Sequence, residues 1–184
     1  MKSTFDRKTL KEMFDGRSVS PILPYHSLDS DRETAKLVAE GNGRISLSGV
    51  QAKYSMVVDN GIIRLAEKGE QGLYILKPIP TASFILDRDY CPYNEHLTMN
   101  IASHAFGIQT APCCICYFGN GDAAFMVRRF DIGADGTKFA QEDFAQLAGL
   151  NKNNGGENFK YDILSYEECA ELITAKVRAA RSEL

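Results

Sequence analysis

The stretch Arg44–Lys77, RISLSGVQAKYSMVVDNGIIRLAEKGEQGLYILK, decides the fold of this chain. Its apolar residues alternate with polar ones in a pattern that predicts a strand, a short loop, a returning strand, a turn and a third strand. The loop at Ser46–Gly49 consists of small residues, which let main-chain N–H groups approach an anion closely. Asp59–Gly61 contains the Asn-Gly pair that is typical of a tight hairpin turn.

Lys77 ends the third predicted strand, directly after the apolar run Leu73–Leu76. An ammonium group at the end of a buried strand needs a partner, and phosphate is a suitable one. The alternative is a solvated strand-end lysine, which is the more common situation for this residue type. The residues alone leave both readings open.

Composition excludes several classes of protein. The chain has 184 residues, 44% of them hydrophobic, which is enough for one or two packed units. A net charge of −3 gives no signature of direct nucleic-acid binding. No apolar segment long enough to span a membrane and no signal peptide is present, so we expect a cytoplasmic protein without membrane contact. The five cysteines indicate reduced thiols, and their spacing predicts no metal site.

The chain divides into three expected parts. Residues 1–43 form a helical leader, with a helix at about 6–14, an extended link at 21–24 and a second helix at about 31–40. Residues 44–150 form the central lobe. Residues 151–184 contain a linker and the start of a further helical region, whose last helix has no stop signal before Leu184 and therefore predicts a truncated chain.

The central lobe continues beyond Lys77 with a polar loop at 78–93 and a helix. We expect Asn94 to cap this helix and Gly107 to stop it, with Leu97, Ile101 and Ala105 on one face. Two more strands follow at 111–118 and 123–130, joined by a turn at 119–122. The second is apolar on both faces, which indicates a strand covered on both sides. Glu142 and Asp143 then open a helix. The expected fold class is α+β, with a mainly antiparallel β-sheet of about five strands and packed helices.

This order of elements is that of the N-terminal lobe of a protein kinase. Such a lobe has a small-residue loop over the phosphates, a strand lysine that neutralises their charge, and a helical carboxylate that holds the lysine. Lys77 and Glu95 occupy the last two positions, 18 residues apart. Glu95 could equally be a first-turn carboxylate that only stabilises the helix dipole.

Several motifs, in order, resemble those of HipA-family serine/threonine kinases, and the shorter HipT-like members most. They are Ser46-Leu47-Ser48-Gly49-Val50-Gln51-x-Lys53, Tyr74-Ile75-Leu76-Lys77-Pro78, Asn94-Glu95-His96-Leu97-x-Met99, Val127-x-Arg129-Phe130-Asp131 and Glu142-Asp143-x-x-Gln146. The resemblance covers about residues 8–180. It implies an ATP-binding, protein-kinase-like N-terminal lobe of a toxin from a toxin–antitoxin system.

The resemblance also implies roles for individual residues. Lys77 would contact the nucleotide phosphates beside Glu95, and the main chain around Arg128 and Phe130 would meet adenine. Asp131 would bind the ribose, and Gln146 would lie near the nucleotide. The complete implied nucleotide-binding set is Ser48, Gly49, Val50, Gln51, Lys77, Glu95, Arg128, Phe130, Asp131 and Gln146, and Ser46 and Ser48 are the implied autophosphorylation sites.

One family feature is missing from the sequence. The catalytic loop, an Asp-x-His-x-x-Asn pattern, and the later magnesium-binding aspartate occur nowhere up to Leu184. No catalytic residue is therefore assigned in this chain, and the ligands of the implied Mg²⁺ are expected outside it. The chain alone is not expected to transfer phosphate. Family analogy also implies a HipB-type antitoxin as partner and a translation factor as substrate.

Structural readings compete with the functional ones. Arg129 and Asp131 could form an ion pair at a strand end, Ser46 and Ser48 could be ordinary loop serines, and His96 and His104 are read as surface or core histidines rather than ligands. For the whole chain, the alternative function is a non-catalytic nucleotide- or partner-binding module, such as a protein that neutralises a related toxin.

Overall fold

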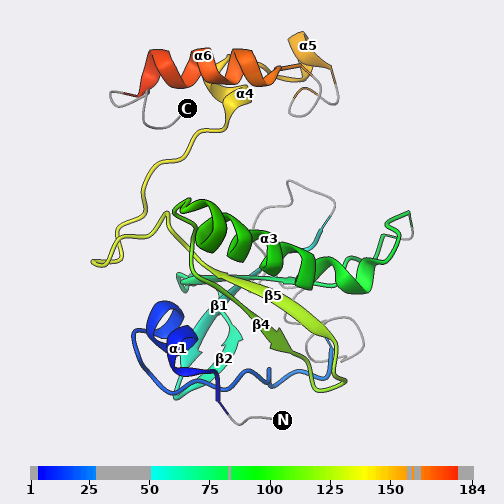
Figure 1. Cartoon of the computed structure of the whole chain (residues 1–184), viewed down its shortest axis with the longest axis vertical. Helices are drawn as coiled ribbons and strands as arrows, with labels where there is room; N and C mark the ends of the chain where they lie inside the picture. The colour runs from blue at the N-terminus through cyan, green and yellow to red at the C-terminus, as the bar shows by residue number, and fades with distance from the viewer. Residues whose placement is uncertain (1–3, 28–50, 83, 157–158, 160–162, 178–184) are drawn as a thin grey trace. The chain divides into compact units, whose positions relative to one another are not determined.

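The computed structural model describes residues 4–27, 51–82, 84–156, 159 and 163–177. The chain separates into two compact units, Met1–Ile132 and Gly133–Leu184. Figure 1 labels most of the elements of both. The first unit contains the sheet and the helices that cover it, and the second contains short helices.

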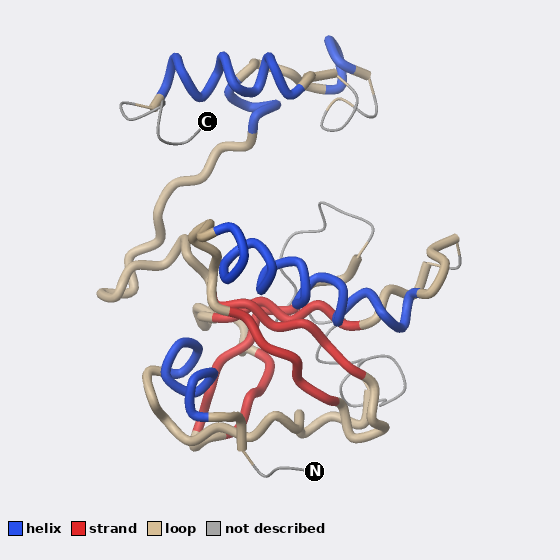
Figure 2. Tube along the Cα trace, viewed as in Figure 1, coloured by secondary structure: helices blue, strands red, loops and turns tan. Residues whose placement is uncertain are grey.

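A five-stranded antiparallel sheet forms the centre of the first unit (Figure 2). Its strands are β1 (Tyr54–Asp59), β2 (Ile62–Leu65), β3 (Tyr74–Pro78), β4 (Cys113–Tyr117) and β5 (Ala123–Arg128). Their spatial order is β2-β1-β3-β5-β4. Strand β5 thus has a neighbour on each side, as its apolar sequence predicts. The α+β fold with an antiparallel sheet is confirmed.

The β1–β2 hairpin turns at the predicted Asn-Gly pair. Asn60 and Gly61 have φ values of 48° and 79°, which is the left-handed conformation that this turn type requires. The Gly61 carbonyl accepts a hydrogen bond of 2.9 Å from the Ser20 N–H. The hairpin is therefore fastened to the leader segment as well as closed by its own turn.

Helix α1 (Arg7–Phe14) covers one face of the sheet, where Met13 and Phe14 are fully buried. Asp6 caps its first turn, and the helix lies within the predicted range 6–14. The extended link that follows runs parallel to β4: the Leu23 N–H donates to the Tyr117 carbonyl at 2.8 Å. This link covers the outer edge of β4, which would otherwise present unpaired main-chain groups.

Helix α3 (Cys91–Phe106) crosses the opposite face of the sheet (Figure 1) and contacts β4 and β5. A 3-10 turn, η1 (Arg88–Tyr90), leads into it. The expected cap at Asn94 is wrong, because the helix starts at Cys91 with Pro92 in its first turn, a position that proline favours. The expected stop is confirmed at Gly107, which has a φ of 67°.

The outward face of α3 is apolar. Tyr93, Leu97 and Ile101 are exposed, whereas Glu95 and Asn100 are half-buried on the inward side. The usual amphipathic rule would place the shared face of Leu97, Ile101 and Ala105 against the sheet. In the structure this face points away from the sheet, and the polar face carrying Glu95 points toward it.

The second unit contains α4 (Phe144–Leu147), α5 (Lys152–Gly155) and α6 (Tyr166–Lys176), of which α4 and α6 contact each other. Asp143 and Ser165 cap α4 and α6 in capping boxes with Gln146 and Glu168. Helix α6 ends at Lys176, and Val177 after it has an extended backbone.

Other expectations fall outside the described residues. These are the first predicted strand and the serine loop within 44–50, the helix at 31–40 and the chain end at 178–184.

Candidate functional site

The site begins with the placement of Lys77 on β3. Alternate residues of this strand, Tyr74 and Leu76, face α1 and are buried, so Lys77 faces α3. The register pairs Lys77 with Phe125 on the neighbouring β5. The Lys77 Nζ lies over the Phe125 ring at 5.4 Å from its centroid, a cation–π distance. The ammonium group is therefore held above the middle of the sheet.

Glu95 on α3 forms an ion pair with Lys77. Their side chains are 33% and 21% exposed, so the pair is partly shielded from water. Because α3 begins at Cys91, Glu95 lies in the second turn of the helix and not at its N-terminus. An interaction with the helix dipole alone therefore does not explain the position of Glu95. The pair has the form that protein kinases use, a lysine on the third strand with a glutamate on the helix that follows.

The thiol of Cys113 lies near this pair. Burial, together with the negative charges of Glu95 and Glu12, raises the pKa of Cys113 to about 11. A thiol with such a pKa stays protonated at neutral pH and is a poor nucleophile. Cys113 is therefore a poor candidate for a reactive group in this site.

Gln51 connects the loop motif to the lysine strand. Its side-chain amide donates a hydrogen bond of 2.7 Å to the carbonyl of Pro78, the residue after Lys77. The end of the predicted phosphate loop is thus fixed beside the end of β3. The remaining loop candidates, Ser46, Ser48, Gly49 and Val50, lie outside the described residues.

The end of β5 presents main-chain groups that the sheet does not use. The Arg128 N–H donates to the Pro112 carbonyl at 2.9 Å. In an antiparallel ladder the same residue pair would exchange a second bond, but Pro112 has no N–H to donate to the Arg128 carbonyl. Among the described residues, the Phe130 main chain also makes no hydrogen bond. An acceptor at position 128 and a donor at position 130 are therefore free for a ligand.

The side chain of Asp131 is already paired. Its carboxylate accepts from the Arg129 guanidinium, with 2.8 Å between Arg129 Nε and Asp131 Oδ1. Both side chains are nearly buried, at 12% and 7% exposed. The hydrogen bond to Asp131 raises the pKa of Arg129 further, so the guanidinium stays charged throughout the physiological range. The ion-pair reading is thus confirmed, and the ribose contact of Asp131 stays a prediction.

Gln146 belongs to the second unit. Its side-chain oxygen accepts from the Asp143 N–H at 2.8 Å, and its own N–H donates to the Asp143 carboxylate at 2.8 Å. The structure gives this residue a local capping role. A contact of Gln146 with a nucleotide at Lys77 stays a prediction.

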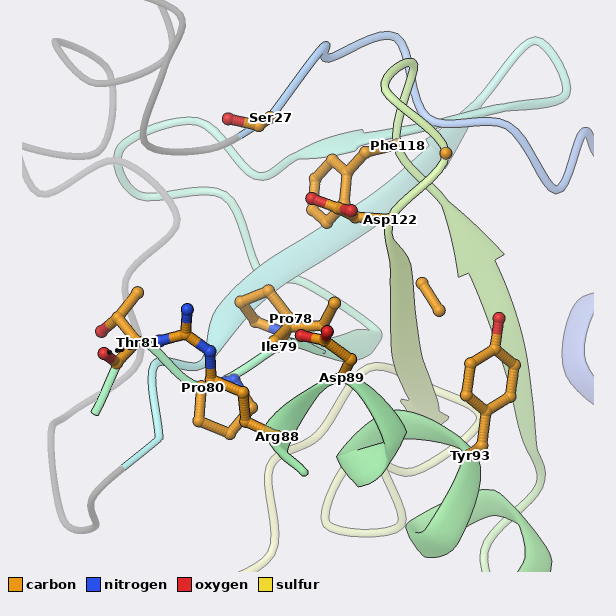
Figure 3. A pocket seen from close by; sticks show the side chains of 12 residues that line it. Ser27, Pro78, Ile79, Pro80, Thr81, Arg88, Asp89, Tyr93, Phe118 and Asp122 are labelled. Carbon is orange, nitrogen blue, oxygen red and sulfur yellow. Dashed lines mark hydrogen bonds between the residues drawn. The ribbon is translucent and has the colours of Figure 1, made fainter. Parts of the chain in front are cut away.

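A cavity of about 420 Å³ lies beyond the end of β3 (Figure 3). It is lined by Pro78, Pro80, Arg88, Tyr93 and Asp122 among others, and Lys77 and Glu95 do not line it. No sequence pattern predicts this cavity, because the segment at 78–93 reads as a polar loop. Its walls come from that loop, the start of α3 and the β4–β5 turn, which are far apart in the sequence.

No helix among the described residues is long and apolar enough to cross a bilayer. The same part of the chain contains no group of three His, Cys, Asp or Glu side chains that could hold a metal ion.

Comparison with known proteins identifies the family. The family model described as HipA-like C-terminal domain matches residues 45–184. A curated protein of Sinorhizobium fredii (strain NBRC 101917 / NGR234), named "Putative kinase Y4mE", is 33% identical over 150 residues, which are 76% of this chain and 32% of that protein. The chain thus spans about a third of the length of this relative.

One similar solved structure is a chain from the Shewanella oneidensis MR-1 toxin–antitoxin complex of HipA, HipB and operator DNA. It matches with a TM-score of 0.47 and 22% identity, over 77% of this chain and 37% of that one. The family match itself covers more than half of the sequence. The chain therefore belongs to the family of proteins with a HipA-like C-terminal domain.

Proposed function

We propose that the central lobe of this chain binds ATP as part of a HipA-like protein serine/threonine kinase, the toxin of a toxin–antitoxin system. The observation that carries the proposal is the Lys77–Glu95 ion pair, which joins β3 to α3 above Phe125. Membership of the family and the kinase name of the curated relative support it.

The pair suits a phosphate-binding role because Glu95 fixes the direction of the lysine without burying it completely. The Lys77 side chain remains 21% exposed, so an anion can approach the ammonium group from the open side. A lysine binds phosphate as a point charge and needs no rigid fork geometry. Gln51, which is fixed to the Pro78 carbonyl, would hold the end of the Ser48–Gln51 loop over the same phosphates.

The free main-chain groups at the end of β5 suit adenine. The 6-amino group of adenine is a donor and its ring nitrogens are acceptors. The Arg128 carbonyl would accept from the amino group, and the Phe130 N–H would donate to a ring nitrogen. Asp131 would contact the ribose, as the family resemblance implies, and Gln146 remains a proposed neighbour of the nucleotide.

Mg²⁺ normally accompanies ATP in this chemistry and neutralises phosphate charge. The described residues hold no carboxylate cluster that fits this ion, so its ligands would come from elsewhere. Ser46 and Ser48 are the proposed autophosphorylation sites of the active kinase. A HipB-type antitoxin and a translation-factor substrate are the proposed partners, and the cytoplasm is the proposed location.

Calorimetric titration of ATP against four proteins tests the proposal: the wild type, Lys77→Ala, Glu95→Gln and the control Lys68→Ala. Lys68 is an exposed lysine of the same unit, in the loop between β2 and β3. A hydrogen bond to a charged group contributes about 1.5–3 kcal/mol, so Lys77→Ala should weaken ATP binding by at least about tenfold. Lys68→Ala should leave the affinity unchanged.

Equal affinity of the wild type and Lys77→Ala would remove Lys77 from the site. Mass spectrometry after incubation with ATP and Mg²⁺ adds a second readout. The 184-residue chain, which lacks the Asp-x-His-x-x-Asn pattern, should not phosphorylate Ser46 or Ser48. Phosphate on either serine would mean that catalytic residues exist within this chain.

A further inference from the structure

The side chain of Arg128 joins the end of β5 to helix α1. Its guanidinium donates two hydrogen bonds to the Asp15 carboxylate, at 2.7 and 3.3 Å, and a longer one of 3.4 Å to the Glu12 carbonyl. The fork geometry of arginine makes this a directional contact. The hydrogen bond to Asp15 raises the pKa of Arg128, so the contact persists at any physiological pH.

Asp15 is itself well anchored, although its side chain is exposed. It ends α1 in the left-handed conformation, with a φ of 55°. The two residues before it, Met13 and Phe14, are fully buried, and the Tyr74 hydroxyl donates to the Met13 carbonyl at 2.9 Å. Tyr74 is also the register partner of Arg128 on β3. The last turn of α1 is thus a fixed support beside the last residue of β5.

The main-chain pairing of position 128 is incomplete on the side of β4. The Arg128 N–H is bonded to Pro112, but the Arg128 carbonyl faces a proline nitrogen that cannot donate. The same peptide is held on its other edge, where the Arg129 N–H donates to the Leu73 carbonyl at 2.9 Å, so only its carbonyl edge lacks a main-chain partner. The guanidinium contact to Asp15 restrains the same residue from its side chain.

We propose that Asp15 is a specificity-determining positioning residue, which acts through Arg128 to hold the carbonyl at position 128 toward the 6-amino group of adenine. The inference rests on the proposed nucleotide-binding function. Guanine carries an oxygen acceptor where adenine carries the amino donor, so a correctly aimed carbonyl accepts a hydrogen bond from ATP and repels GTP. A carbonyl that rotates away loses this preference.

The test measures affinities for ATP and for GTP in the wild type, Asp15→Asn, Asp15→Glu, Arg128→Gln and the double variant Asp15→Asn/Arg128→Gln. The control is Glu70→Gln, which breaks a comparable exposed ion pair with Arg64 on the hairpin. Asp15→Asn should weaken ATP binding by up to about fivefold, the range of an exposed ion pair, and leave GTP binding unchanged or tighter, because a carbonyl that turns away no longer repels the guanine oxygen. Asp15→Glu should restore part of the preference.

The double variant shows whether Asp15 acts through Arg128. If it does, the double variant should be no worse than Arg128→Gln alone, because the second change removes a contact that is already lost. Hydrogen exchange provides a readout without nucleotide: the amide of Arg129, which follows the restrained peptide and donates to Leu73, should exchange faster in Asp15→Asn than in Glu70→Gln.

Equal weakening of ATP and GTP, or additive effects in the double variant, would overturn the inference and reduce Asp15 to a structural residue. Failure of the proposed function looks different: the wild type would bind ATP no better than Lys77→Ala. A wild type that binds ATP through Lys77 and GTP equally well would refute the inference and retain the proposed function.

Discussion

Replacing Tyr74 by phenylalanine should loosen α1 from the sheet. The Tyr74 hydroxyl, in a side chain that is 1% exposed, donates to the Met13 carbonyl at 2.9 Å. This carbonyl belongs to the last turn of α1, where the helix itself supplies no partner. Burial raises the pKa of Tyr74, so the hydroxyl keeps its proton and remains a donor. The contact is therefore a tertiary cap on the C-terminus of the helix.

The expected loss of stability follows from the groups that Tyr74→Phe keeps and removes. Phenylalanine keeps the ring that packs on Phe14, with 5.5 Å between the ring centroids. It removes one hydrogen bond and leaves a buried carbonyl without a partner, which costs about 1–2 kcal/mol. Such a loss corresponds to an increase of about 5- to 30-fold in the population of open forms. The amides of α1 should exchange faster by that factor.

Hydrogen exchange of the α1 amides measures the opening of this helix directly. It also distinguishes a change in the first unit from a change in the second. Tyr90→Phe is the matched control, since the Tyr90 side chain is 61% exposed and lies outside α1. Urea unfolding, followed by a signal from the sheet, should give a lower midpoint for Tyr74→Phe than for the control. Unchanged exchange in α1 together with an unchanged midpoint would refute the capping role.

Three further predictions concern the first unit. Gly61→Ala should destabilise it by about 1–3 kcal/mol, as measured by urea unfolding, because a Cβ would lie 2.8 Å from the Ser18 carbonyl oxygen and φ is 79°; an unchanged midpoint would contradict this. Asp131→Ala should cost about 3–5 kcal/mol by leaving the nearly buried Arg129 cation unpaired, and replacing both by apolar residues should recover part of that loss. Burial lowers the pKa of His96 below 6.5. Near and below this pH the folded state therefore binds fewer protons than the unfolded state. The melting temperature should consequently fall as pH drops below about 6.5. His96→Gln should show a smaller fall, and identical profiles for both proteins would remove His96 as the cause.

The elements that the sequence determined are those with local causes. Asn60 and Gly61 set the hairpin because the turn needs left-handed residues, and Gly107 stops α3 for the same reason. The capping box that begins at Ser165 forms from residues three apart. The alternation around Lys77 places the lysine opposite the buried side chains of β3, which is a property of the strand alone.

Motif order, rather than local physics, anticipated the pairing of Lys77 with Glu95. Composition and spacing also allowed Lys77 to be a solvated surface lysine and Glu95 to be a carboxylate that only stabilises the helix dipole. The contact itself depends on how α3 is rotated about its axis. The amphipathic rule would turn the apolar residues of α3 toward the sheet and Glu95 away from it. In the structure, Leu97 and Ile101 are exposed and Glu95 points toward the sheet.

Only the tertiary structure decided the surroundings of Arg128. Its side-chain partner, Asp15, lies 113 residues earlier in the chain, and no local pattern connects the two. The free carbonyl of Arg128 likewise depends on Pro112 facing it across β4 and β5, a pairing that follows from the sheet register. Local sequence sets turns, caps and strand faces because their energies come from neighbouring residues, whereas these contacts arise only when distant segments pack together.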